Sequence, residues 1–424
     1  MAQFLSFRGL RYNTEKVELS RVLCPPYDVI KGAARDELLA KDAHNIVAIE
    51  LAARYGENAT PEQYAASAAL LEQWTQEGLF LRDDASYYVY EQQFLVPGTS
   101  DSLRRRGVIG ALTVEEFGSG VLPHEHTLSG PKADRLNLLR ALRTNTSPIF
   151  GLVADEDGWI VRLIEDVILD HPVCAATDAE GITHTLWKVT DDEMVNAFEA
   201  AFENEAVLIA DGHHRYETAL NYFKETGSQA DGASSVMMMC VSTSDAGLVV
   251  LPTHRVVKNV EEARLAGLVS RLSQLFEVTP TQHGPVELAA AIPSEGTGQI
   301  AMHLKGQSYL LSLKNGLRHL ESMESGRSEA YNTLDVSLLH RLILENELGV
   351  GQQELAAGQH VLYTIDAEEA VRKVEAGEAG AAFLLRPTPV DQVQAVAASG
   401  DKMPQKSTYF YPKLMTGLVL RPLD

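Results

Sequence analysis

The sequence predicts an α+β fold with mixed α/β layers, and three observations support this prediction. Short runs rich in β-branched and aromatic residues alternate with helical patterns along the whole chain, which is typical of packed sheets and helices. Hydrophobic residues make up 45% and charged residues 22% of the 424 residues, as in an ordinary globular protein. No repeat or low-complexity tract interrupts the pattern. At roughly 150 residues per domain, this length allows two or three domains.

The first block, residues 1–255, carries the clearest element signals. Pro61 to Gly78 is predicted as a helix, because proline opens it, apolar side chains recur every three or four residues, and glycine closes it. The stretches Ser86–Phe94 and Arg106–Glu116 are predicted as strands, since they are rich in aromatic and branched residues. The stretch Asp155–Asp178 contains the best candidate for a surface excursion.

The second block, residues 256–424, is predicted to form a separate α+β unit. Residues 300–304 and 309–313 have the composition of two hairpin strands, and Leu334–Leu348 has the spacing of an amphipathic helix. The final segment, residues 401–424, is a candidate to return to the first block.

Charge and cysteine content exclude several classes of protein. Lys and Arg number 36 against 58 Asp and Glu, a net charge of −22, which argues against a coat for nucleic acid or anionic membrane. Cys24, Cys174 and Cys240 lie far apart without a CxxC motif, so neither a disulfide framework nor a structural zinc site is predicted. No apolar run approaches about 18 residues, and no signal peptide is evident. A cytoplasmic protein is expected.

The strongest functional signal is a predicted strand, turn and helix over Ala206–Phe223. The turn comprises Asp211, Gly212, His213, His214 and Arg215. Glycine permits the sharp turn, and free N–H groups at a helix start attract anions. The arginine and the histidines add donors, so phosphate is the expected guest. The alternative is an Asp that merely caps the helix, followed by surface histidines.

A second group of polar residues lies in the stretch Pro123–Arg135. The group consists of His124, Glu125, His126, Lys132, Asp134 and Arg135. His-x-His beside carboxylates can bind a divalent metal, although the spacing matches no standard metal motif. Lys132 and Arg135 favour contact with an anion instead, and a solvated charged loop is the remaining alternative.

Three shorter stretches add candidates. Lys406, Ser407 and Thr408 place one positive charge and two hydroxyls in a turn, which suits phosphate, but the glycines of a P-loop are absent. Asp28 lies in a proline-stiffened turn, where it is either a fixed carboxylate or a turn cap. Leu251–Arg255 adds a His–Arg pair that is either a ligand contact or surface.

These stretches together resemble domain-of-unknown-function family 1015, and the resemblance runs from the N-terminus to the C-terminus of the chain. The stretches that carry the resemblance are FRGLRYN, PPYDVI, PHEHTLSGPKADR, NTSPIFGL, ADGHHRYETALNY, LPTHR and MPQKSTYFYPK. That family resembles the ParB/sulfiredoxin superfamily, which includes nucleotide-dependent free-serine kinases. The resemblance implies a ParB/sulfiredoxin-like core in residues 1–255, with the C-terminal α+β unit added to it.

The turn after the predicted strand is similar to the Gly-Cys-His-Arg turn at the nucleotide phosphate site of sulfiredoxins. His213 stands where the reactive cysteine would be, which argues against sulfinate repair. The match implies phosphate contacts from His214, Arg215 and the backbone around Gly212. By analogy with the serine kinases of this superfamily, Asp28 is the nearest candidate for the base that accepts the serine proton. Glu125 is the second candidate.

The resemblance and the residues together predict phosphoryl transfer on free serine or phosphoserine, with ADP or ATP and magnesium as cofactors. Such chemistry needs cations on the phosphates and a carboxylate near the acceptor hydroxyl. Asp211 is expected to hold magnesium or to orient His213, which could itself carry the phosphoryl group transiently. Additional phosphate contacts are expected from Lys132, Arg135, Lys406, Ser407 and Thr408.

Two other functions fit the same residues. One is a nucleotide-responsive binding protein without turnover. The other is a metal-dependent hydrolase, whose ligands would be His124, Glu125, His126, Asp211, His213 and His214. The expected partners are a nucleotide and a small molecule, with neither a membrane nor, given the charge, a nucleic acid. The sequence leaves open the choice of ADP or ATP, the kinase or phosphatase direction, and the oligomeric state.

Overall fold

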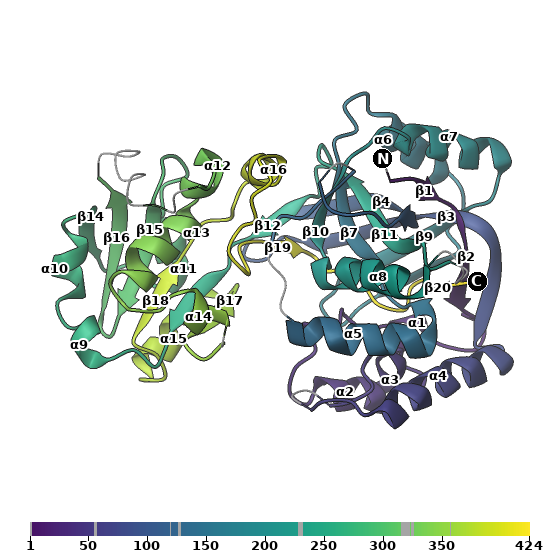
Figure 1. Ribbon diagram of the computed structural model, residues 1–424, viewed down its shortest axis with the longest axis horizontal. Helices are drawn as coiled ribbons and strands as arrows, with labels where there is room; N and C mark the ends of the chain where they lie inside the picture. The colour runs from purple at the N-terminus through teal and green to yellow at the C-terminus, as the bar shows by residue number, and fades with distance from the viewer. Residues whose placement is uncertain are drawn as a thin grey trace. The chain divides into compact units, whose positions relative to one another are not determined.

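The computed structural model describes residues 2–54, 57–118, 120–125, 129–227, 232–314, 323, 326–356 and 358–424. The chain forms two compact units, which are considered separately here (Figure 1). Unit 1 consists of Met1–Pro123, Thr127–Val249 and Pro412–Asp424, and unit 2 consists of His124–His126 and Val250–Tyr411. Residues 250–255, predicted in the first block, thus lie in unit 2, and the segment that returns to unit 1 begins at Pro412.

Unit 1 is built on a mixed sheet that has ten strands among the described residues. These strands are β1 (Phe4–Leu5), β2 (Phe7–Tyr12), β3 (Phe80–Leu95), β4 (Ser102–Thr113), β5 (Val121–Leu122), β7 (Ile149–Val153), β8 (Cys174–Thr177), β9 (Thr183–Val189), β10 (Val207–Asp211) and β11 (Ser235–Ser242). The order is β5-β10-β7-β11-β4-β3-β9-β8, with β1 beside β4 and β2 beside β3. The predicted strands 86–94 and 106–116 are the antiparallel pair β3–β4. A short sheet pairs β6 (Thr144–Asn145) with β20 (Arg421–Pro422).

Helices cover the sheet of unit 1. They are α1 (Leu19–Val22), α2 (Ala34–Lys41), α3 (Val47–Glu50), α4 (Pro61–Gln76), α5 (Ser129–Leu142), α6 (Trp159–Val167), α7 (Asp192–Phe202) and α8 (His213–Thr226). Helix α4 begins where predicted, because Pro61 occupies its first turn and the Thr60 side chain accepts the Gln63 backbone N–H in a capping box. Helix α8 packs on α5, and α5 packs on α4 (Figure 1).

The stretch 155–178, in which the sequence predicts a surface excursion, is in part packed on the core of unit 1. This stretch contains α6 and β8, and α6 buries Ile160, Ile164 and Val167 in the main hydrophobic core of unit 1. The spacing of these three residues places them on one face of a helix.

Unit 2 contains a sheet that has six antiparallel strands within the described ranges, in the order β14-β16-β15-β18-β13-β17. Its strands and the pair β12–β19 are β12 (Val249–Leu251), β13 (His254–Val257), β14 (Phe276–Thr281), β15 (Gln299–Leu304), β16 (Gln307–Leu313), β17 (Val361–Thr364), β18 (Ala381–Leu384) and β19 (Tyr409–Tyr411). The predicted hairpin is β15–β16. The core of this unit includes Val256, Leu288 and Val374.

The helices of unit 2 are short. They are α9 (Glu262–Leu265), α10 (Leu268–Leu272), α11 (Pro285–Ala290), α12 (Glu329–Asn332), α13 (Asp335–Leu338), the π-helix η3 (Leu339–Glu345), α14 (Gln352–Ala356), α15 (Ala367–Glu375) and α16 (Val390–Ala398). The helix predicted over Leu334–Leu348 is therefore α13 continued by a π-helical segment. Sheets and helices in both units confirm the predicted α+β class. In the part of the chain that the structure describes, no helix has the length and apolarity needed to cross a bilayer.

Candidate active site

The predicted strand–turn–helix is present in unit 1 as β10, Gly212 and α8. Strand β10 is buried, and Gly212 takes a left-handed conformation, with φ of 95°, at the N-cap of the 14-residue helix α8. A Cβ atom at position 212 would lie 2.8 Å from a guanidinium nitrogen of Arg215. Glycine is therefore required here both for the backbone angle and for the space that Arg215 occupies.

Arg215 and Lys413 converge on the carboxylate of Asp211. Arg215 donates from Nη2 to Oδ2 of Asp211 over 3.3 Å, and Lys413 donates from Nζ to Oδ1 over 3.2 Å. The Nη1 of Arg215 is held by Ser147 Oγ at 3.0 Å and by the carbonyl of Pro148 at 2.7 Å. Two cations and one carboxylate leave a positive excess at the start of α8, where the helix dipole also favours an anion.

The turn that contains Asp28 lies within electrostatic range of this site. Burial and the charge of Asp28 raise the pKa of the Tyr27 phenol, Asp211 raises it further, and Arg135 and Arg215 oppose the rise. The guanidinium of Arg135 also lies over the Tyr27 ring, 4.4 Å from its centroid. Asp28 is half-buried and lies in the same unit as the start of α8, and its predicted role as a base stays a prediction.

Lys132 and Arg135 of α5, both predicted to contact phosphate, are paired with carboxylates. Arg135 is buried and donates to Glu50 Oε1 over 2.9 Å and to Asp134 Oδ2 over 2.6 Å. Lys132 donates to Glu217 Oε2 over 2.7 Å. A phosphate contact from Lys132 or Arg135 stays a prediction, and it would have to compete with these pairs.

The two histidines of the turn differ in exposure. His213 is the first residue of α8 and is buried, whereas His214 is half-buried. Their predicted roles, phosphoryl carrier for His213 and phosphate contact for His214, stay predictions.

The other predicted residues come together in unit 2. The Lys406 backbone N–H donates to Glu125 Oε1 over 3.0 Å, and the Thr408 hydroxyl lies 3.0 Å from His124 Nε2. Ser407 and Thr408 are both buried, and the Ser407 hydroxyl donates to the carbonyl of Pro404. These hydroxyls already have partners within the chain, and their predicted phosphate contacts stay predictions.

The LPTHR stretch belongs to the same cluster in unit 2. Arg255 is fully buried and donates to the carbonyls of Thr253 and Gln405, over 2.5 and 3.3 Å. Its guanidinium lies 5.4 Å from the ring centroid of Tyr363. Burial lowers the pKa of Arg255 to about 10. From the sequence, His254 and Arg255 are either ligand contacts or surface residues. Both are buried in the structure, so they are not surface residues.

The predicted metal ligands do not form a metal centre among the described residues. No group of three or more His, Cys, Asp or Glu side chains gathers there, and His126 lies outside the described ranges. Each oxygen of Asp211 accepts a hydrogen bond from a cation, so magnesium binding by Asp211 stays a prediction, and the metal would have to compete with Arg215 and Lys413.

Sequence reasoning missed three residues that build the site in unit 1. Lys413 supplies the second cation, Ser147 holds Arg215, and Glu50 pairs with Arg135. Lys413 and Ser147 lie inside stretches that carry the family resemblance, so each had a signal. Glu50 had none, because an isolated glutamate in a helical pattern looks like a solvated surface residue.

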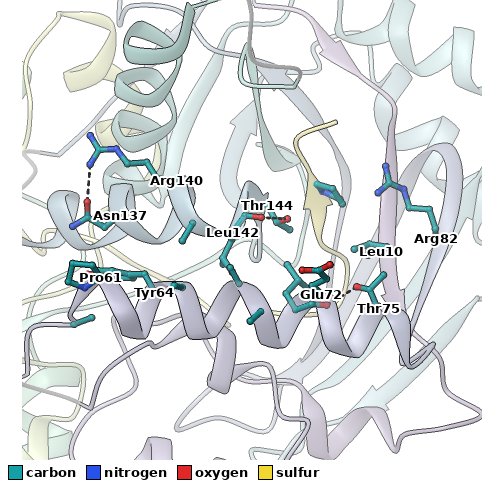
Figure 2. Close-up of a pocket in the computed structure, with 17 residues that line it drawn as sticks. Leu10, Pro61, Tyr64, Glu72, Thr75, Arg82, Asn137, Arg140, Leu142 and Thr144 are labelled. Carbon is teal, nitrogen blue, oxygen red and sulfur yellow. Dashed lines mark hydrogen bonds between the residues drawn. The ribbon is translucent and has the colours of Figure 1, made fainter.

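A groove of about 900 Å³ lies elsewhere in unit 1, between α4 and α5. Figure 2 shows Tyr64, Glu72 and Thr75 of α4 along one side, and Asn137 and Arg140 of α5 along the other. None of the predicted site residues lines the groove.

A protein-family model matches residues 4–337, and its description is "Protein of unknown function (DUF1015)". The chain belongs to this family. No curated protein matches the DUF1015 chain.

Similar solved structures include a conserved hypothetical protein from Pyrococcus furiosus, at 13% identity and a TM-score of 0.34, over 71% of this chain and 96% of that one. Free serine kinase in complex with AMP is 13% identical with a TM-score of 0.34, over 70% and 89%. C-terminally truncated SbnI from Staphylococcus aureus is 10% identical with a TM-score of 0.33, over 72% and 84%.

Proposed function

We propose that this DUF1015 protein binds the phosphates of a nucleotide at the start of α8 and transfers a phosphoryl group to or from the hydroxyl of free serine. The observation that carries the proposal is the convergence of Arg215 and Lys413 on Asp211 at a helix N-terminus. Residues 1–255 are proposed as a ParB/sulfiredoxin-like core, on the resemblance of the Gly-His-His-Arg turn.

The geometry suits a phosphate in three ways. Arg215 can grip two oxygens with its planar guanidinium, and Lys413 adds a point charge. The N-terminus of α8 carries the positive end of the helix dipole, which complements the negative charge of a phosphate. Asp211 holds both cations at the turn, so we assign it as a positioning residue. A phosphate that binds here replaces the Asp211 carboxylate as the acceptor of the hydrogen bonds from Arg215 and Lys413.

Asp28 is the proposed base. The serine hydroxyl gives its proton to the Asp28 carboxylate while its oxygen attacks the terminal phosphorus of the nucleotide, and the bond from that phosphorus to the bridging oxygen breaks. Phosphoryl transfer depends mainly on such positioning and on charge stabilisation. The reverse reaction consumes phosphoserine. Glu125 stays the second candidate for the base.

The proposed reaction is tested by phosphorus NMR on the full chain. One sample contains serine with ADP or ATP, and the other contains phosphoserine with and without AMP or ADP. Each is run with magnesium and with a chelator, which also tests the metal requirement. We expect a phosphoserine signal that grows in the first sample or decays in the second, and that is lost in the variants Arg215→Ala and Asp28→Asn.

The matched control is Arg140→Ala. Arg140 is an exposed arginine of the same unit and pairs with Glu225 on the surface, so its removal should leave turnover unchanged. Full activity of Arg215→Ala would refute the site, and loss of activity in Glu125→Gln but not in Asp28→Asn would assign the role of base to Glu125. If the wild-type protein changes neither sample but binds ADP in a calorimetric titration, the protein is a nucleotide-responsive binding protein without turnover.

A further inference from the structure

Ser308, His303 and Glu375 form a chain of hydrogen bonds in unit 2 that the proposed function does not use. The Ser308 hydroxyl lies 2.9 Å from His303 Nδ1, and His303 Nε2 lies 2.8 Å from Glu375 Oε1. A hydroxyl, an imidazole and a carboxylate in this order are the groups of a serine nucleophile, its general base and the residue that orients the base. Such a set is identified by its geometry and not by the order of its residues in the chain.

The β15–β16 hairpin and helix α15 bring the three side chains together. His303 and Ser308 are cross-strand partners across the short turn of the hairpin, and the side chains of such partners lie beside each other on one face of the sheet. Helix α15 packs against β15, and Glu375 is its last residue. Oε1 of Glu375 also accepts the Gly306 backbone N–H over 2.8 Å, which fixes the carboxylate at the hairpin.

The hydrogen-bond partners determine where the protons lie. The bonds from the Gly306 N–H and from His303 lower the pKa of Glu375, so the carboxylate is the form present near neutral pH. A carboxylate can only accept, so His303 Nε2 must carry the proton of their shared bond. Nδ1 is then the unprotonated nitrogen of the neutral ring, and it accepts the hydroxyl proton of Ser308. The imidazole is therefore held in the tautomer that can remove this proton.

The hydrogen-bond chain lies at the exposed end of the hairpin. The turn residues Lys305 and Gly306 are exposed, as is 44% of the Glu375 side chain. Ser308 itself is 7% exposed, so its hydroxyl is accessible to a small reactant and closed to a bulky one. The position of the chain thus favours a compact substrate that approaches from the turn.

We propose that Ser308 is the nucleophile of a second activity, the hydrolysis of small esters. Ser308 Oγ attacks the carbonyl carbon and gives its proton to His303 Nδ1. The bond from that carbon to the alcohol oxygen breaks, and the alcohol leaves with the proton from His303. Water then attacks the acyl-serine with His303 again as base, which releases the acid and restores the hydroxyl. Glu375 touches no reacting atom and is a positioning residue, whose charge stabilises the imidazolium that forms.

The test uses the full chain without nucleotide, with methanesulfonyl fluoride as the probe of the nucleophile and p-nitrophenyl acetate as the ester. In the reaction with the probe, Ser308 Oγ forms a bond to sulfur, fluoride leaves, and His303 takes the proton. We expect peptide mass spectrometry to locate one methanesulfonyl group on Ser308. Labelling and ester hydrolysis should be lost in Ser308→Ala and should fall about 100-fold in His303→Asn, because a general base contributes at least this much.

The variant Glu375→Gln separates a positioning role from a purely structural one. The amide oxygen of glutamine can accept the same bonds from His303 and Gly306, so a hairpin that is merely tied to α15 should react at the wild-type rate. A carboxylate that stabilises the imidazolium predicts labelling slower by about tenfold or more, with an unchanged thermal midpoint.

The matched control is Ser312→Ala. Ser312 lies on the same strand, but its hydroxyl donates to the Gln299 side chain and not to a base, so both rates should stay unchanged. Thermal unfolding of each variant identifies any loss of folding. The site of labelling is determined on the wild-type protein, so it does not depend on the folding of a variant.

An unlabelled Ser308 in the wild-type protein would overturn the proposal, as would equal labelling rates in the wild type and His303→Asn. Ester hydrolysis that persists in Ser308→Ala would overturn it as well. A wild-type rate in Glu375→Gln would overturn the positioning role of Glu375. These measurements involve neither nucleotide nor serine as a substrate, and no residue of the α8 site is changed, so failure here is distinct from failure of the proposed function.

Discussion

Lys413 donates a hydrogen bond to Oδ1 of Asp211 over 3.2 Å, although the two residues are 202 positions apart in the chain. This contact exists because Pro412–Asp424 returns to unit 1. With Arg215 on the other oxygen of Asp211, the candidate site needs both the middle and the end of the chain.

The variant Lys413→Gln should weaken ADP binding about 10- to 100-fold, the usual effect of removing one charge-assisted hydrogen bond. Calorimetric titration at two salt concentrations checks this prediction. The salt dependence of binding should also fall, because one cation fewer contacts the phosphates. Lys224→Gln is the control, since Lys224 is half-exposed on α8 and pairs with Glu116 on the surface. Equal losses in both variants would contradict a specific role for Lys413.

The variant Gly212→Ala should lower turnover about 100-fold, because an added Cβ displaces Arg215 and small misplacements of catalytic groups have effects of this size. Phosphorus NMR rates give the measurement. Gly158→Ala provides the comparison: Gly158 is also a left-handed N-cap, with φ of 67°, but a Cβ there would be 3.7 Å from Arg162. Gly158→Ala should lose about 1 to 2 kcal/mol of stability and keep its turnover. A wild-type turnover rate in Gly212→Ala would contradict the requirement of Arg215 for the space beside Gly212.

The variant Glu50→Gln should lower the free energy of unfolding by about 1.5 to 3 kcal/mol, because it removes the buried carboxylate that pairs with Arg135 and leaves the more exposed Asp134 beside it. The Glu50 and Arg135 side chains are 2% and 6% exposed. Glu225→Gln breaks an exposed pair with Arg140, at 47% and 44% exposure, and should cost about 0 to 1 kcal/mol. Urea denaturation compares the two variants, and a similar loss in both would refute the strong coupling of Glu50 and Arg135.

His254 should make unit 2 less stable as the pH falls. Burial, followed by the charge of Arg255, lowers the pKa of His254 to about 4 from its ordinary 6.5. Because the unfolded chain binds the proton more readily, stability is lost as pH falls from about 6.5 to about 4. The Nδ1 atom accepts the Leu385 N–H over 3.2 Å, and this bond requires the neutral ring.

The variant His254→Asn keeps an acceptor near the Nδ1 position and cannot titrate in this range. We expect its thermal midpoint to fall less steeply than that of the wild type between pH 6.5 and 4. In NMR titrations, a histidine signal with a midpoint near pH 4 should be missing from the variant. Identical pH profiles would show that His254 is not held neutral by the fold.

Helix and strand ends could be predicted from the sequence where they depend on capping or turn residues within a few positions. Proline and a capping Thr start α4, and Gly212 ends a buried strand and opens α8. The stretch 155–178 is harder to interpret from its composition, because acidic residues are interspersed among the apolar ones, although Ile160, Ile164 and Val167 have helical spacing. Periodicity was the better guide there, since burial depends on one face of a helix and not on its average polarity.

The strand–turn–helix of the Asp-Gly-His-His-Arg stretch follows from the sequence alone, because backbone preferences and helix capping act between near neighbours. The sequence does not predict which charged side chains form ion pairs. Lys132 and Arg135 are paired with Glu217 and Glu50, each 85 residues away, and spacing along the chain carries no signal for such pairs. The tertiary fold decided these contacts, and it brought Lys413 to Asp211, because sheet order and helix packing set which distant side chains share a low-dielectric environment.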